Sequence, residues 1–119
     1  METILITGST GFIGMELAKT LAARGHRLHL LVRSPEKAKS LLRDGVTLYR
    51  GDITDIDSLE AAMIGTTYVF HLAALAKQVS DDPADFEHIN VEGTRYVLEC
   101  ALRHNIRKVV YTSTAGVFG

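Results

Sequence analysis

Short apolar segments alternate with helical patterns along the chain, and this alternation constrains the fold more than any other feature. We expect strands at residues 3–7, 28–32, 46–50, 67–71 and 108–112. Three of them contain the mostly continuous apolar runs ILI, LHLLV and KVVY, which are typical of strands buried on both faces of a parallel sheet. The alternation predicts one α/β domain over residues 1–119, a Rossmann-type doubly wound sheet of five parallel strands in the order 3-2-1-4-5, with helices on both faces.

The helical segments begin at recognisable signals. Ser34-Pro35 and Asp82-Pro83 each place a capping residue before a proline, and Thr54 with Asp57 resembles a weak capping box.

The longest candidate helix covers residues 83–105 and carries two apolar stripes. The first stripe comprises Phe86, Ile89, Gly93, Val97 and Ala101. The second stripe comprises Val91, Leu98 and Leu102. We interpret the second stripe as part of a helix that is buried on two sides. A homodimer contact through this helix is the alternative.

The composition excludes several classes of function. A formal net charge of -1 gives no support for binding to nucleic acid or to an anionic membrane surface. No apolar run approaches the roughly 18–20 residues of a membrane helix, and the first residues do not resemble a signal peptide. Cys100 is the single cysteine, so no intrachain disulfide is possible and we expect a reducing, cytoplasmic setting. No metal site is expected.

A glycine-rich stretch, TGSTGFIG, joins the first expected strand to the first expected helix. Its three glycines permit positive φ, close approach of a pyrophosphate to backbone N–H groups at a helix N-terminus, and tight packing of helix on strand. The hydroxyl groups in the stretch can add donors to a phosphate. A turn that binds no ligand is the alternative. The expected cofactor-binding residues are Gly8, Ser9, Thr10, Gly11, Phe12, Ile13 and Gly14.

This stretch resembles the fingerprint of the extended short-chain dehydrogenase/reductase family, which includes NAD-dependent epimerases, dehydratases and related reductases. Four later stretches agree with the family in order and spacing: GDITD at 51–55, VFHLAA at 69–74, NVEGT at 90–94 and VVYTSTAGVFG at 109–119. Together they cover nearly the whole chain, although they match only the N-terminal portion of the family.

The resemblance implies roles for further residues. Asp52 and Ile53 match the pair that holds the adenine ring, and Asn90 matches a helix asparagine that organises the active site. At the end of the fourth strand, the cofactor's ribose and pyrophosphate would lie close to Leu72, Ala73 and Ala74. Asp52 could instead be a turn residue, and Asn90 a polar residue on a helix face. We interpret His71 as a structural histidine and Cys100 as a small core residue.

The end of the second expected strand favours NADP(H) over NAD. NAD-binding folds usually place a carboxylate there, on the ribose 2′-hydroxyl, whereas this sequence has Arg33 followed by Ser34. Arg33 can meet a 2′-phosphate, with Ser34 and Lys37 assisting. A solvated arginine at a strand end is the alternative.

The family's catalytic apparatus is only partly represented in this sequence. Thr114 matches the serine or threonine that polarises the reacting oxygen, with Ser113 as the second choice, and Phe118 stands where many relatives carry tyrosine. None of the four tyrosines is followed four positions later by the lysine of the family's Tyr-x-x-x-Lys motif. We therefore expect a truncated portion of a larger enzyme, inactive by itself.

The resemblance implies that the parent protein is a reductase, epimerase or dehydratase that uses hydride transfer on a sugar nucleotide or a small carbonyl or alcohol substrate. The alternative is a non-catalytic NADP(H)-binding sensor or scaffold module.

Overall fold

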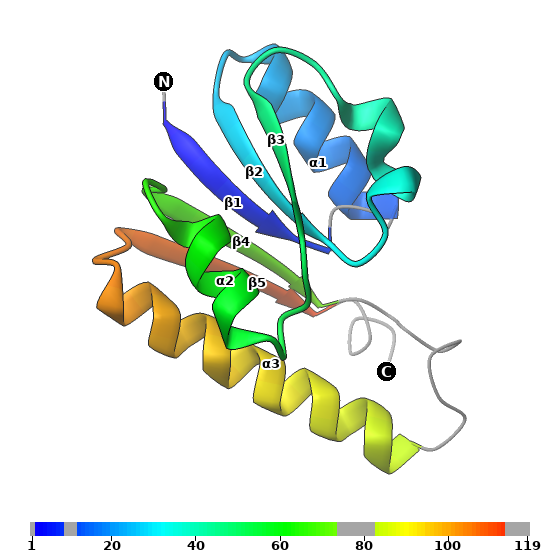
Figure 1. Cartoon of the computed structure of the whole chain (residues 1–119), viewed down its shortest axis with the longest axis vertical. Coiled ribbons are helices and arrows are strands. Elements are labelled where there is room, and N and C mark those ends of the chain that lie inside the picture. Colours follow the sequence, from blue (N-terminus) through cyan, green and yellow to red (C-terminus); the bar gives the residue numbers. More distant parts are fainter. Residues whose placement is uncertain (1, 9–11, 74–82, 114–119) are drawn as a thin grey trace.

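The computed structural model describes residues 2–8, 12–73 and 83–113, which form a parallel sheet between two layers of helix (Figure 1). The elements are β1 (Thr3–Thr7), α1 (Phe12–Ala23), β2 (Arg27–Val32), the 3-10 helix η1 (Pro35–Leu41), β3 (Val46–Arg50), α2 (Ile56–Met63), β4 (Tyr68–Ala73), α3 (Pro83–Arg103) and β5 (Lys108–Ser113). Every expected strand is present to within two residues at each end. The expected helix after Ser34-Pro35 is a 3-10 helix.

The five strands lie in the order β3-β2-β1-β4-β5 and all pair in parallel, as the sequence predicts. In Figure 1, α1 lies on one side of the sheet, and α2 and α3 lie on the other. This arrangement confirms the doubly wound α/β fold.

The core follows the two-residue period of the strands. Ile4 and Ile6 of β1 pack in the cluster on the α1 and η1 side, which includes Ala18 and Leu41. Leu5, between them in the sequence, packs on the α2 and α3 side in a second cluster. The second cluster also contains Leu31, Leu59, Met63, Val69, Val97 and Cys100. Both faces of the sheet are therefore buried, which explains the apolar runs.

Only one of the two stripes on α3 is buried within the described residues. Val97 and Ala101 lie in the core, whereas Leu98 is 48% exposed and Leu102 is 80% exposed. The interpretation of a helix buried on two sides is therefore wrong for these two leucines. None of the described helices is both long enough and apolar enough to span a membrane.

Candidate nucleotide-binding site

The strand register brings the candidate residues to one edge of the sheet. Thr7, the last residue of β1, pairs with both Leu31 and His71. Ala73 at the end of β4 pairs with Ser113 at the end of β5. The strand order also reverses between β1 and β4, and doubly wound folds bind their ligands in the crevice at such a reversal, outside the carboxyl ends of the strands.

Gly8 occupies the turn that leaves β1 at this crevice, with φ of +80°. A Cβ atom on Gly8 would lie 2.5 Å from the Leu72 carbonyl oxygen and 3.1 Å from Leu72 Cβ. Both the positive φ and the close approach of β4 require glycine here. The structure thus supports the expected tight turn, and it places Leu72 directly against that turn.

The rest of the glycine-rich stretch is described only in part. The backbone of Phe12 and Ile13 forms the start of α1, and Gly14 is buried in the same turn. The other expected phosphate-binding residues, Ser9, Thr10 and Gly11, lie outside the described residues. Their role stays a prediction.

For four further candidates, the structure gives either the backbone position alone or no position. Asn90 belongs to α3, and Ser113 ends β5. Ala74 and Thr114 lie outside the described residues. The choice between Thr114 and Ser113 as the polarising group therefore stays open.

Asp52 follows β3 and is held by turn contacts. Its Oδ1 accepts a hydrogen bond from the Thr54 backbone N–H at 3.2 Å. Ser58 Oγ accepts from the Asp52 N–H at 3.1 Å and lies 3.0 Å from the Asp52 carbonyl oxygen. These contacts support the interpretation as a turn residue. A carboxylate can accept about four hydrogen bonds, so the turn bond leaves capacity for an adenine amino group.

Ile53 packs directly on α3, a contact that the sequence does not reveal. Gly93 is buried in α3, and a Cβ atom there would lie 2.2 Å from Ile53 Cδ1 and 2.6 Å from Ile53 Cγ1. The missing side chain at Gly93 therefore lets the loop that carries Asp52 and Ile53 lie directly against α3.

His71 links three elements beside the crevice. Its Nδ1 lies 2.7 Å from Thr7 Oγ1 of β1, and its Nε2 lies 3.0 Å from Thr94 Oγ1 of α3. The imidazole is 2% exposed, and burial lowers the pKa of His71 to about 4. The ring is therefore neutral at pH 7, with one nitrogen donating and the other accepting. This confirms a satisfied structural histidine.

The His71 contacts also orient α3. Thr94 lies four residues after Asn90, so the two residues share one face of the helix. The sequence motifs VFHLAA and NVEGT contain both partners, but nothing in either motif indicates that they meet.

Arg33 directly follows β2, and it is exposed at the carboxyl edge. The neighbouring Ser34 begins η1, yet its side chain makes no capping hydrogen bond. The exposed Arg33 guanidinium and the Ser34 hydroxyl therefore lie where a dinucleotide-binding fold recognises the ribose 2′ position.

A parallel, doubly wound sheet whose first glycine turn lies at the strand-order reversal defines a Rossmann-type dinucleotide-binding fold. Comparison with known proteins identifies the family. The model of the NAD dependent epimerase/dehydratase family matches residues 4–119, and the chain belongs to this family.

Relatives with different activities match the chain over nearly its whole length. Sterol demethylase protein B of Methylococcus capsulatus is 34% identical over 98% of this chain and 36% of its own length. Cinnamoyl-CoA reductase 1 of Oryza sativa is 38% identical over 97% of this chain and 35% of its own length. The chain thus spans about a third of the length of these relatives.

Solved structures agree with the fold. The UDP-glucose 4-epimerase of Thermus thermophilus, in complex with NAD, superposes with a TM-score of 0.80. It is 31% identical in sequence, and the match covers 96% of this chain and 38% of the epimerase. This relative therefore binds a nicotinamide dinucleotide on the same architecture.

Proposed function

We propose that this chain is the NADP(H)-binding portion of an oxidoreductase of the epimerase/dehydratase family. The parent would be a reductase, epimerase or dehydratase that transfers hydride to or from a sugar nucleotide or a small carbonyl or alcohol substrate. The observation that carries the choice of NADP(H) is Arg33, an exposed cation that directly follows β2, where NAD-binding folds usually place a carboxylate.

The chain's residues would bind and orient the cofactor, while the nicotinamide ring would supply or accept the hydride. The turn at Gly8 suits a pyrophosphate because it lacks a side chain at the crevice and leads into the N-terminus of α1. Asp52 and Ile53 would hold the adenine, and Arg33 the 2′-phosphate. Thr114 or Ser113 would polarise the reacting oxygen, and Asn90 would organise the site around it.

The cofactor preference is tested by titrating the protein with NADPH and NADH. A charge-assisted hydrogen bond is worth roughly 1.5–3 kcal/mol, which corresponds to about a ten- to hundredfold change in affinity. We expect Arg33→Asp to lose NADPH affinity by about this factor while NADH affinity changes little. Arg43→Asp is a matched control, because Arg43 is exposed and precedes β3, at the opposite edge of the sheet. An Arg33→Asp protein that keeps its preference for NADPH refutes the proposal.

A non-catalytic NADP(H) sensor or scaffold is the second candidate. Lack of a Tyr-x-x-x-Lys motif in the full gene would favour it, and presence of the motif would favour the enzyme. We expect residues 1–119 to bind NADPH without turnover. Oxidation of NADPH by the purified chain with a carbonyl substrate, lost in a Gly11→Val control, would contradict this expectation.

Self-association through α3 extends the proposal. The exposed Leu98 and Leu102 border a hollow of about 590 Å³ between the end of α3 and the beginning of β5. We propose that a second copy of the chain covers this face.

The buried, single cysteine is consistent with the reducing, cytoplasmic setting that we propose for the protein.

A further inference from the structure

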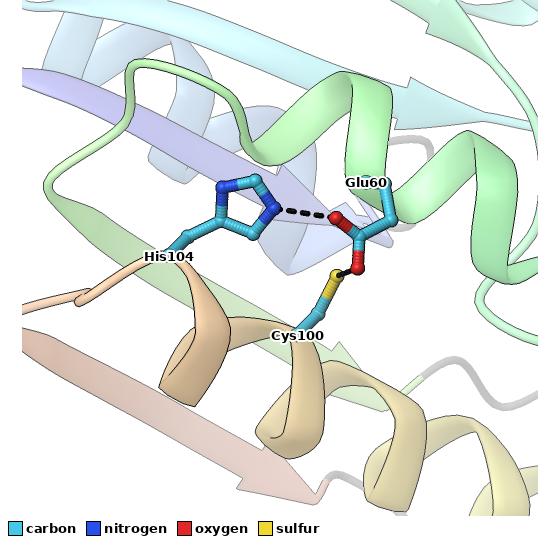
Figure 2. A group of neighbouring side chains, drawn as sticks. All are labelled: Glu60, Cys100 and His104. Atoms are coloured by element: carbon cyan, nitrogen blue, oxygen red, sulfur yellow. Dashed lines mark hydrogen bonds and ion pairs between the residues drawn. The ribbon is translucent and has the colours of Figure 1, made fainter.

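A cluster of polar side chains joins α2 to α3, away from the nucleotide edge (Figure 2). Glu60 comes from α2, and Cys100, Arg103 and His104 come from the end of α3 and the turn that follows it. That end of α3 leads into the start of β5, at the edge opposite the carboxyl ends of the strands. The cluster is therefore separate from the site described above.

Three metal-ligating groups converge in this cluster. His104 Nε2 lies 2.6 Å from Glu60 Oε1, and Cys100 Sγ donates to Glu60 Oε2 at 3.1 Å. Figure 2 shows the imidazole and the thiol directed at the same carboxylate, the thiol from α3 and the imidazole from the turn that follows it. The carboxylate oxygen, sulfur and nitrogen all lie within 4.8 Å of one another. Cys100 is fully buried, whereas the Glu60 and His104 side chains are 33% and 22% exposed, which leaves a path from solvent.

The ligand types select the kind of ion. A thiolate, an imidazole nitrogen and a carboxylate oxygen are the protein ligands of Zn²⁺, whereas Mg²⁺ and Ca²⁺ prefer oxygen ligands. Cys100 and His104 are separated by one helical turn, so both can face one ion. We propose that Glu60, Cys100 and His104 bind a divalent transition-metal ion of the zinc type, with water completing a tetrahedral shell.

The ligand atoms need only small movements to surround the ion: the contacts of 2.6 Å and 3.1 Å must open, and the longest separation must close. Tetrahedral bonds of about 2.0–2.3 Å place neighbouring ligand atoms roughly 3.3–3.8 Å apart. The longest separation in the cluster, at most 4.8 Å, therefore shortens by about 1 Å on binding, a change that side-chain rotation supplies.

Arg103 competes with the ion. Its guanidinium donates to Glu60 Oε2 through Nε at 2.9 Å and also through Nη2. Without metal, the Arg103 cation balances the Glu60 carboxylate. With Zn²⁺ bound, the carboxylate and a Cys100 thiolate balance the ion, and the Arg103 charge becomes surplus. The Arg103 side chain is 52% exposed and can turn into solvent.

Binding is coupled to release of the thiol proton. Burial and then the Glu60 carboxylate raise the pKa of Cys100 to about 11, so the thiol is protonated in the metal-free protein. The ion displaces this proton to the buffer when the metal–sulfur bond forms. The charged or titratable groups that face the thiol are Glu60 from α2, Arg103 from the end of α3, and His104 from the turn that follows.

The bound ion would clamp two helices whose other ends support the nucleotide edge. α2 begins shortly after Ile53, and α3 carries Asn90 and Thr94. The clamp therefore acts on the scaffold of the cofactor site and not on the reacting atoms.

Titration of the tag-free protein with Co²⁺, followed by displacement with Zn²⁺, tests the proposal. We expect one ion per chain, with tetrahedral cobalt bands in the visible and a thiolate-to-cobalt charge-transfer band in the near ultraviolet. Cys100→Ser should abolish the charge-transfer band, and His104→Gln should weaken binding at least tenfold. Arg103→Gln should tighten binding, because it removes the competing cation.

The controls separate this site from unspecific binding. Glu99→Gln is the matched variant, since Glu99 lies beside Cys100 on α3 but is exposed and pairs with Arg95. It should leave cobalt binding unchanged. His104→Gln replaces a partly exposed side chain and serves if Cys100→Ser fails to fold. A folded wild-type protein without the charge-transfer band, or a His104→Gln protein with unchanged affinity, overturns the proposal.

Discussion

Replacing Gly93 by alanine tests whether its contact with Ile53 positions the loop after β3. A Cβ atom at Gly93 would lie 2.2 Å from Ile53 Cδ1, 2.6 Å from Cγ1 and 3.3 Å from Cβ. Carbon atoms in contact are normally about 3.5–4.0 Å apart, so Ile53 must retreat by roughly 1 Å or more. Rotation about χ2 moves only Cδ1, and χ1 of a β-branched residue is stiff. The loop itself must therefore shift.

Two opposing effects set the magnitude. Alanine is favoured over glycine inside a helix by about 1 kcal/mol. Overpacking of a close contact costs about 1–3 kcal/mol. We expect Gly93→Ala to lower the free energy of unfolding by about 1 kcal/mol, although helix propensity alone predicts an increase of the same size.

A double-mutant cycle with Ile53→Ala isolates the contact. Removing the Ile53 γ and δ carbons eliminates the two shortest contacts, so Gly93→Ala should raise the free energy of unfolding by up to about 1 kcal/mol in that background. The coupling between the two substitutions is then about 2 kcal/mol, measured by urea unfolding of all four proteins. Equal effects of Gly93→Ala in both backgrounds would refute the reasoning.

Three further predictions concern Gly8, His71 and Leu102. Gly8→Ala should destabilise the protein more than Gly65→Ala in urea unfolding. Both residues have φ near +80°, which costs a side-chain-bearing residue about 1–2 kcal/mol, but only a Gly8 Cβ meets another residue, the Leu72 carbonyl. Burial lowers the pKa of His71 from 6.5 to about 4. Between these two pH values the imidazole is protonated in the unfolded chain but neutral in the folded protein. The free energy of unfolding should therefore fall by about 3 kcal/mol in total as the pH drops from 6.5 through 4, and the same slope in His71→Leu would contradict this assignment. Leu102→Glu should shift the protein from dimer to monomer in light scattering, whereas Lys19→Glu, on the exposed face of α1, should not.

Local sequence patterns were sufficient to predict the secondary structure, and the reason is physical. A strand buried on both faces must be largely apolar, so a segment such as Leu28–Val32, apolar except for His29, can be recognised from the sequence. Parallel strands joined by helices then permit few topologies, and the expected order was confirmed. The weak capping box was less informative: Asp55, not Thr54, caps α2, because its side chain accepts from the Ser58 N–H. Neighbouring polar residues compete for that position with similar energies.

The candidate site was predictable where it follows the ends of strands. Gly8, Arg33 and Asp52 lie at one edge because parallel strands all end there. The positions of Ser9, Thr10, Gly11, Ala74 and Thr114 rest on the sequence alone.

Tertiary structure alone decided which distant residues meet. His71 finds Thr7 and Thr94, and Glu60 finds Cys100 and His104, across separations of 23 to 64 residues. His71 and Thr7 meet because their strands pair in register. The other pairs depend on how helices pack, and packing is set by the shapes of many side chains together, which leave no periodic trace in the sequence. The sequence by itself determined the layers, the strand order and the edge at which we propose that the nucleotide binds. The packing of α2 and α3 decided how that edge is supported and where three metal-ligating groups converge.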